Sequence, residues 1–211
     1  MADEKDGRVS LSKPVTMVFP WLFEPRAFGA KGKESGEPKY SANFLFASDN
    51  PDLKRLAAKV REVAASQWPG RDLAGLKFPF VKGDKQADAA KAKGKDGEFQ
   101  RGQTIVVARS KYEPRLSVIE NRQAIDLDGP ARAAAKAKFY SGVQVLAQFN
   151  FVAYKGVGAN PDGVTAYLDM VCSTNTGKRI GGGASAAEVF KGYAGQETSE
   201  NPTGTDDDIP F

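Results

Sequence analysis

Residues 142–154 read GVQVLAQFNFVAY and decide the fold class of this chain. Apolar side chains occupy the odd positions from Val143 to Phe151, whereas the even positions include Gln144, Gln148 and Asn150. This period of two predicts a long strand with one buried face. Residues 155–163 then predict a turn, and Val164 to Cys172 predict a strand that returns beside the first.

Similar patterns predict strands on the N-terminal side of this pair. They cover Val15 to Phe23, Tyr40 to Phe46, Thr104 to Arg109 and Leu116 to Ile119. Pro20 interrupts the first of these strands, which predicts an edge position or a bulge there.

The sequence predicts few helices. Asn50 and Pro51 begin an amphipathic helix that ends near Trp68, where core packing is expected of the indole. Shorter helices are predicted from Gly129 to about Lys138 and, through a capping box, from Ser185. Residues 82–102 are rich in Lys, Gly, Ala and Asp without apolar periodicity, which predicts a mobile surface loop.

About six strands with two or three short helices predict a mainly β fold. No helix regularly follows each strand, so a doubly wound parallel sheet is disfavoured, and an antiparallel barrel or sandwich fits better. We expect one body over residues 1–194 and a disordered acidic tail over residues 195–211.

The composition excludes several classes of site. The 211 residues include no histidine and one cysteine, Cys172, so disulfides within the chain, Cys/His zinc sites and His-dependent nucleophilic catalysis are excluded. The alternating register predicts that Cys172 is a core residue. Asp126 and Asp128 form a tight carboxylate pair beside a Gly-Pro turn, and a solvated turn is favoured over a metal site. We expect no cofactor.

The location of the protein is also predicted from the sequence. The apolar runs are too short to span a membrane, and the first eight residues are charged where a signal peptide would be apolar. We therefore expect a soluble protein of a reducing compartment, the cytoplasm of a bacterial host.

The charge of the chain is segregated. The chain has 30 Lys and Arg residues against 26 Asp and Glu, a net charge of +4. Residues 195–211 contain five acids and no Lys or Arg, so the body alone carries +9. A basic body attracts polyanions, and nucleic acid is a better candidate than a membrane because no basic amphipathic helix with a strongly apolar face is evident.

Binding of unpaired nucleic acid requires cations for the phosphates and exposed rings on which bases stack. Residues 109–115, RSKYEPR, supply Arg109, Lys111, Tyr112 and Arg115 between two predicted strands. A plain charged loop is the alternative for this segment.

Tyrosines of the long strand pair are further candidates. Tyr154 ends the polar face of the first strand beside Lys155, and Tyr167 lies on the polar side of the returning strand. The alternative for each is an amphipathic tyrosine that covers a sheet edge.

Weaker candidates come from other segments. Trp21 and Tyr40 share a register with apolar neighbours, so core packing is favoured over base stacking. Lys82 and Lys85 could fold over a bound strand, although a solvated loop is equally compatible with the sequence.

The last six residues, DDDIPF, resemble the C-terminal tip of bacterial single-stranded DNA-binding proteins. The resemblance implies that the tip docks on replication and repair proteins. Pro210 and Phe211 would be the anchor after Ile209, and the residues Asp206, Asp207 and Asp208 would steer the approach. A solubilising acidic tail is the alternative.

The body is similar to a family of bacteriophage single-stranded DNA-binding proteins. The resemblance lies in Lys39-Tyr40 and the strand after it, and in residues 78–83, 110–114, 139–142, 150–154 and 184–190. It implies an OB-type antiparallel barrel.

Together these patterns predict a phage protein that binds single-stranded DNA without sequence preference in replication, recombination or repair, and that is not an enzyme. It would recruit partner proteins through its tip and could form homo-oligomers. An RNA-binding OB module and a metal-dependent nuclease or strand-exchange enzyme are the alternatives.

Overall fold

The computed structural model describes residues 7–27, 29–30, 33–34, 36–158 and 160–181. The chain divides into two units, Met1–Ile180 and Gly181–Phe211, and the description here is of the first. The predicted boundary at residue 194, the helix predicted from Ser185 and the acidic tip lie outside the described residues and stay predictions.

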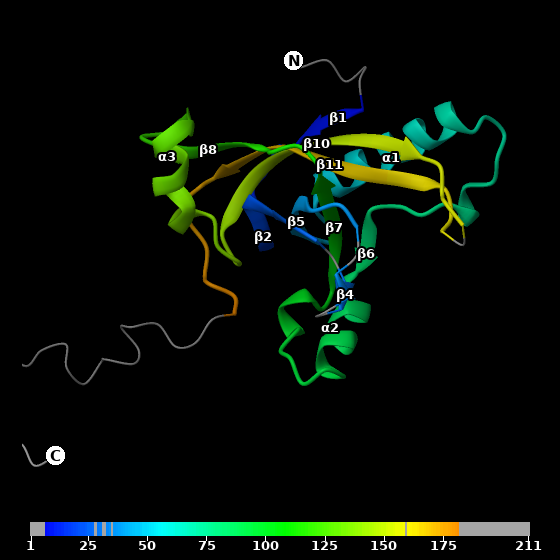
Figure 1. Cartoon of the computed structure of the whole chain (residues 1–211), viewed down its shortest axis with the longest axis horizontal. Coiled ribbons are helices and arrows are strands. Elements are labelled where there is room, and N and C mark those ends of the chain that lie inside the picture. The colour runs from blue at the N-terminus through cyan, green and yellow to red at the C-terminus, as the bar shows by residue number, and fades with distance from the viewer. Residues whose placement is uncertain (1–6, 28, 31–32, 35, 159, 182–211) are drawn as a thin grey trace, which may run out of the picture. The chain divides into compact units, whose positions relative to one another are not determined.

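Strands dominate the first unit, as predicted (Figure 1). The strands are β1 (Arg8–Ser10), β2 (Val15–Arg26), β3 (Gly29–Ala30), β4 (Lys33–Glu34), β5 (Lys39–Ala47), β6 (Phe80–Lys82), β7 (Gln103–Ser110), β8 (Arg115–Glu120), β9 (Gln123–Asp126), β10 (Gln144–Tyr154) and β11 (Gly163–Ser173). The helices are α1 (Pro51–Gln67), α2 (Gly83–Lys91) and α3 (Gly129–Ala134), with short 3-10 turns at Leu73–Gly75, Glu98–Gln100 and Ala135–Lys138.

All six predicted strands are present, and β10 and β11 form the predicted antiparallel pair over their full lengths. The short strands β1, β6 and β9 and the β3–β4 hairpin were not predicted. No helix in the described ranges is long and apolar enough to cross a membrane.

The strand pairings return to their starting point. β2 pairs with β5, β5 with β7, β7 with β11, β11 with β10, and β10 with β2 again. Only the β7–β11 contact in this cycle is parallel. β1 is added at the edge of β10, and β8 and β9 extend the sheet beyond β11.

The main core lies on one face of this cycle, the core face, and a smaller cluster of Val18, Leu45 and Ile105 is buried on the opposite face. The odd residues of β10 from Val145 to Phe151 are buried on the core face as predicted, and the Phe149 ring meets Phe44 of β5 edge to face, with the ring centres 4.9 Å apart. Helix α1 packs on β10 and β11 through Leu56, Val60 and Ala64, whose spacing of four places them on one stripe. The predicted burial of Cys172 and the predicted packing of Trp68 against the core are confirmed.

A bulge in β2 changes the side chains that face the core. Phe19 adopts a φ of +52°, and the register with β5 shifts between Val18 and Trp21, which confirms the bulge predicted at Pro20. One extra residue reverses the alternation, so Leu22 enters the core and Trp21 turns to the opposite, outer face. The expected core packing of Trp21 is therefore wrong, and its side chain is 39% exposed.

The loop predicted over residues 82–102 is also wrong, because this segment folds into α2 and a 3-10 turn (Figure 1). Gly83 is essential to the fold here, since a Cβ would lie 1.8 Å from the Gln100 carbonyl oxygen. Arg101 closes the segment through ion pairs with Glu98 at 2.8 Å and Asp88 at 3.0 Å. The composition of residues 82–102 did not predict this structure, because few of the contacts that hold it are apolar.

Candidate nucleic-acid interface

A line of paired residues crosses the outer face of the sheet. Trp21 of β2 is the register partner of Ser41 on β5, and Ser41 is the partner of Arg109 on β7. Directly paired residues point to the same face, so these three side chains are neighbours on the outer face. Ser41 is buried between its two large neighbours in the row.

The line continues onto three more strands. Ala108 pairs with Ala166 of β11 on the core face, which places the next residues, Arg109 and Tyr167, together on the outer face. Tyr167 pairs with Asn150 of β10, and Asn150 pairs with Arg8 of β1. We call Trp21, Ser41, Arg109, Tyr167, Asn150 and Arg8 the outer row.

A groove lies beside the outer row. A second set of register partners crosses the same face, two residues along β1 and β10 from Arg8 and Asn150. Its members are Ser10, Gln148, Met170 and Arg115. The groove has a volume of about 690 Å³. Its lining residues are Arg8, Ser110, Tyr112, Glu113, Arg115, Gln148, Asn150, Val152, Tyr167, Leu168 and Asp169.

The β7–β8 turn forms one wall of the groove and is held at both ends. Lys111 pairs with Glu37 at 2.6 Å, and this hydrogen bond raises the pKa of the lysine. Glu113 forms an ion pair with Arg132 at 2.8 Å. The Arg132 guanidinium also donates a hydrogen bond to the Leu22 carbonyl oxygen. The turn thus presents Tyr112, 77% exposed, from a fixed base.

Two cations pack tightly in or beside the outer row. Burial lowers the pKa of the Arg109 guanidinium, which remains charged at neutral pH. The Arg26 guanidinium lies 4.6 Å from the centre of the Trp21 ring, a cation–π contact on one face of the indole.

The structure brings most of the predicted binding residues together. Trp21, Arg109 and Tyr167 belong to the outer row, Tyr112 and Arg115 line the groove, and Lys111 lies in the turn above it.

The other predicted residues lie apart from the row. Tyr40 shares the core-face register of β5 and is half-buried. Tyr154 ends β10, opposite Gly163, and burial together with Asp162 raises its pKa; Lys155 follows it. Lys82 pairs with Thr104 and begins the segment that carries Lys85, about 16 Å along β7 from Arg109.

Four residues of the row and the groove are not among the predicted site residues: Arg8, Gln148, Asn150 and Asp169. Polar Arg8 and Ser10 alternate with apolar Val9 and Leu11. This period of two was the available sequence signal for β1. Asp169 shares the polar side of the predicted returning strand with Thr165 and Tyr167, and this alternation was the available sequence signal for its position.

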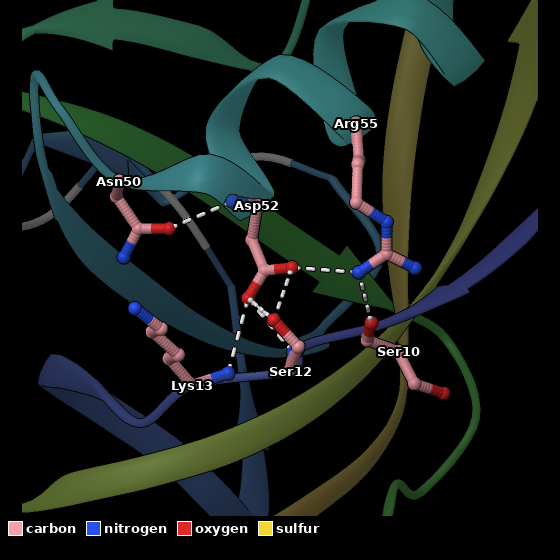
Figure 2. Close-up of polar contacts among 6 residues, drawn as sticks. All are labelled: Ser10, Ser12, Lys13, Asn50, Asp52 and Arg55. Atoms are coloured by element: carbon pink, nitrogen blue, oxygen red, sulfur yellow. Dashed lines mark hydrogen bonds and ion pairs between the residues drawn. The ribbon is translucent and has the colours of Figure 1, made fainter.

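A buried carboxylate fixes the segment that follows β1 (Figure 2). Asp52 accepts hydrogen bonds from the Ser12 amide at 2.8 Å, the Ser12 hydroxyl at 3.0 Å and the Lys13 amide at 3.1 Å. Arg55 pairs with it at 2.6 Å, and Asn50 caps the helix through the Asp52 amide. Burial alone would raise the pKa of Asp52, but these hydrogen bonds lower it overall. The cluster ties the end of the outer row to α1.

Within the described ranges, no group of three or more Asp, Glu, His or Cys side chains is placed to hold a metal ion. Asp126 lies on the edge strand β9, and Asp128 precedes α3.

Comparisons with known proteins agree on one kind of relative. A family model described as Enterobacter phage Enc34, ssDNA-binding protein, matches residues 8–202. No curated protein matches the sequence.

Solved structures of the single-stranded DNA-binding protein from bacteriophage Enc34 are similar in fold. One has a TM-score of 0.61 at 18% identity and covers 86% of this chain and 88% of its own. Another, in complex with ssDNA, has a TM-score of 0.61 at 19% identity and covers 83% of this chain and 90% of its own.

Proposed function

The chain belongs to the family of the Enterobacter phage Enc34 single-stranded DNA-binding protein, and from this premise we propose that it binds single-stranded DNA along the outer row. The observation that carries the proposal is the row itself, in which two aromatic rings and two guanidinium groups follow one another from strand to strand around the outside of the cycle, over six strands. At about 4.8 Å between neighbouring strands, the row is about 24 Å long.

We further propose that the closed cycle of β2, β5, β7, β11 and β10 is an OB-type barrel. Proteins of that fold have five barrel strands and bind oligonucleotides on the second and third of them and on adjoining loops. In chain order the second and third strands of the cycle are β5 and β7, which carry Ser41 and Arg109.

Binding would combine two sequence-tolerant interactions. Each base that stacks on Trp21, Tyr167 or Tyr112 would contribute about 1–3 kcal/mol. Arg8, Arg109, Lys111 and Arg115 would neutralise phosphates as condensed counterions leave the strand. Neither interaction needs a particular base or a chemical step, so the protein would bind and protect DNA rather than cleave it.

A titration of the full chain with dT oligomers of increasing length at two salt concentrations tests this function. Neutralisation of about 5 phosphates gives a log–log salt slope near −3.5. Tighter binding of a matched RNA oligomer would favour an RNA-binding module instead. Cleavage of labelled DNA with Mg²⁺ or Mn²⁺ would reveal a nuclease, and failure to bind dT would overturn the proposal.

We propose that residues 195–211 regulate this site and recruit partners in the bacterial cytoplasm during phage replication, recombination or repair. A flexible segment of this length spans about 20–25 Å, and its five acids would compete with phosphates for the basic face. Bound DNA would release the tip, so that Phe211 and Pro210 could dock on a replication or repair protein.

Deletion of residues 195–211 is expected to tighten dT binding at low salt and to abolish recruitment of partner proteins. The tighter binding follows from removal of five negative charges that compete with DNA. Affinity is measured by fluorescence titration of the full and shortened chains. A control that replaces the five acids by their amides keeps the length and should reproduce the gain. An unchanged affinity at low salt would rule out the competition.

A further inference from the structure

Two carboxylates line the groove that the proposed function assigns to a polyanion, Glu113, which is paired with Arg132, and Asp169. Asp169 lines the groove with its side chain 25% exposed, and its Oδ2 lies 3.0 Å from Nε of Arg8. A negative charge in a purely phosphate-binding groove weakens binding, so a role with another part of the ligand is needed to explain its position.

Asp169 faces the groove because it lies two residues after Tyr167, and the alternation of β11 places both side chains on the outer face. Gln148 pairs with Met170, whereas the next residue, Phe149, pairs with Leu168, so Asp169 is the extra residue on β11. Bulges re-aim a side chain and are common beside functional sites. Here the bulge also turns Met170, the partner of Gln148, to the outer face beside Asp169, while Leu168 stays in the core.

The surroundings of Asp169 suit a base better than a phosphate. Tyr167 lies two residues away on the same strand and offers a ring face, and Asn150 and Gln148 offer amide groups. Gln148 donates to the Ser10 hydroxyl at 2.9 Å, which fixes its amide. Three of the four cations assigned to phosphates, Arg109, Lys111 and Arg115, lie on the β7–β8 side, and on the β10 side Arg8 is paired with Asp169. Most phosphates would therefore follow the β7–β8 side, and a base would point toward β10.

At neutral pH an ionised carboxylate accepts hydrogen bonds and donates none, and it can accept about four. Asp169 can therefore accept a hydrogen bond from a base while it remains paired with Arg8. Among the bases, cytosine presents an N4 amino group, adenine an N6 amino group and guanine an N2 amino group, whereas thymine has none. Resting on the proposed function, we propose that Asp169 accepts a hydrogen bond from the exocyclic amino group of one stacked base. The groove would thus bind bases that carry an exocyclic amino group more tightly than thymine, without requiring a particular DNA sequence.

Oligomers of dC and dU test this subsite because the two pyrimidines differ at positions 3 and 4 and neither carries the thymine methyl group. The wild-type chain is expected to bind dC about fivefold more tightly than dU near pH 8. Asp169→Asn should reduce this ratio to about one while dU binding stays equal or tightens, since the substitution removes repulsion of phosphates. Asp169→Glu keeps the charge but moves the carboxylate, and should lower the ratio without tightening dU binding.

Asp126→Asn is the matched control, because it removes the same charge from the exposed strand β9 and should leave the dC to dU ratio unchanged. A ratio near one in the wild type, with both oligomers bound, would overturn this inference and leave the proposed function intact. An equal loss of dC and dU binding in Asp169→Asn would assign the residue a structural role and also overturn it. Failure of the wild type to bind either oligomer would instead overturn the proposed function.

Discussion

Joint replacement of Trp21 and Tyr167 by alanine is expected to weaken dT binding by about 4 kcal/mol, close to a thousandfold in the dissociation constant. The two rings are the aromatic members of the outer row, and each substitution would remove the ring on which one base stacks. Titration of the double variant and of each single variant measures the loss. The single variants should each lose about 1–3 kcal/mol.

Fluorescence separates stacking from unfolding in this experiment. The chain has two tryptophans, and Trp68 packs against the core, so quenching by dT should come from Trp21. Trp21→Phe should keep most of the affinity but lose the quenching. Ile125→Ala, which removes an exposed apolar side chain from β9, is the control and should bind dT normally. Binding by the double variant within twofold of the wild type would exclude the outer row as the binding path.

Asp52→Ala is expected to lower the free energy of unfolding by about 3 kcal/mol. The substitution leaves the Ser12 and Lys13 amides and the Arg55 guanidinium without their shared acceptor (Figure 2). Urea denaturation measures the effect. Asp49→Ala, an exposed residue just before α1, should change stability by less than about 0.5 kcal/mol. Equal stability of the two variants would contradict the role given to this cluster.

The stabilisation by Asp52 also has a defined pH dependence. Its pKa in the folded chain lies below the ordinary value of 3.8, so between the two values the unfolded chain binds more protons. The contribution is therefore fully present above about pH 4 and is lost as the pH falls through the folded-state pKa. The difference in stability between the wild type and Asp52→Asn should shrink over that acid range and stay constant from about pH 5 to 8.

The β strands that form the core could be predicted because their information is local. The alternation from Val143 to Phe151 reflects one buried face, and the same rule identified β5, β7 and β11. The cap at Asn50 and the stripe of Leu56, Val60 and Ala64 likewise determined α1. The charge segregation also follows from the sequence, and with it the prediction of a nucleic-acid-binding face, since charge does not depend on packing.

The tertiary structure alone decided which of the candidate residues are neighbours. Trp21 reached the outer face through the β2 bulge, which shifts the alternation by one residue. Arg8, Arg109 and Tyr167 are far apart in sequence and meet through strand register. Register is set by the packing of all strands together, so no single segment of the sequence contains it.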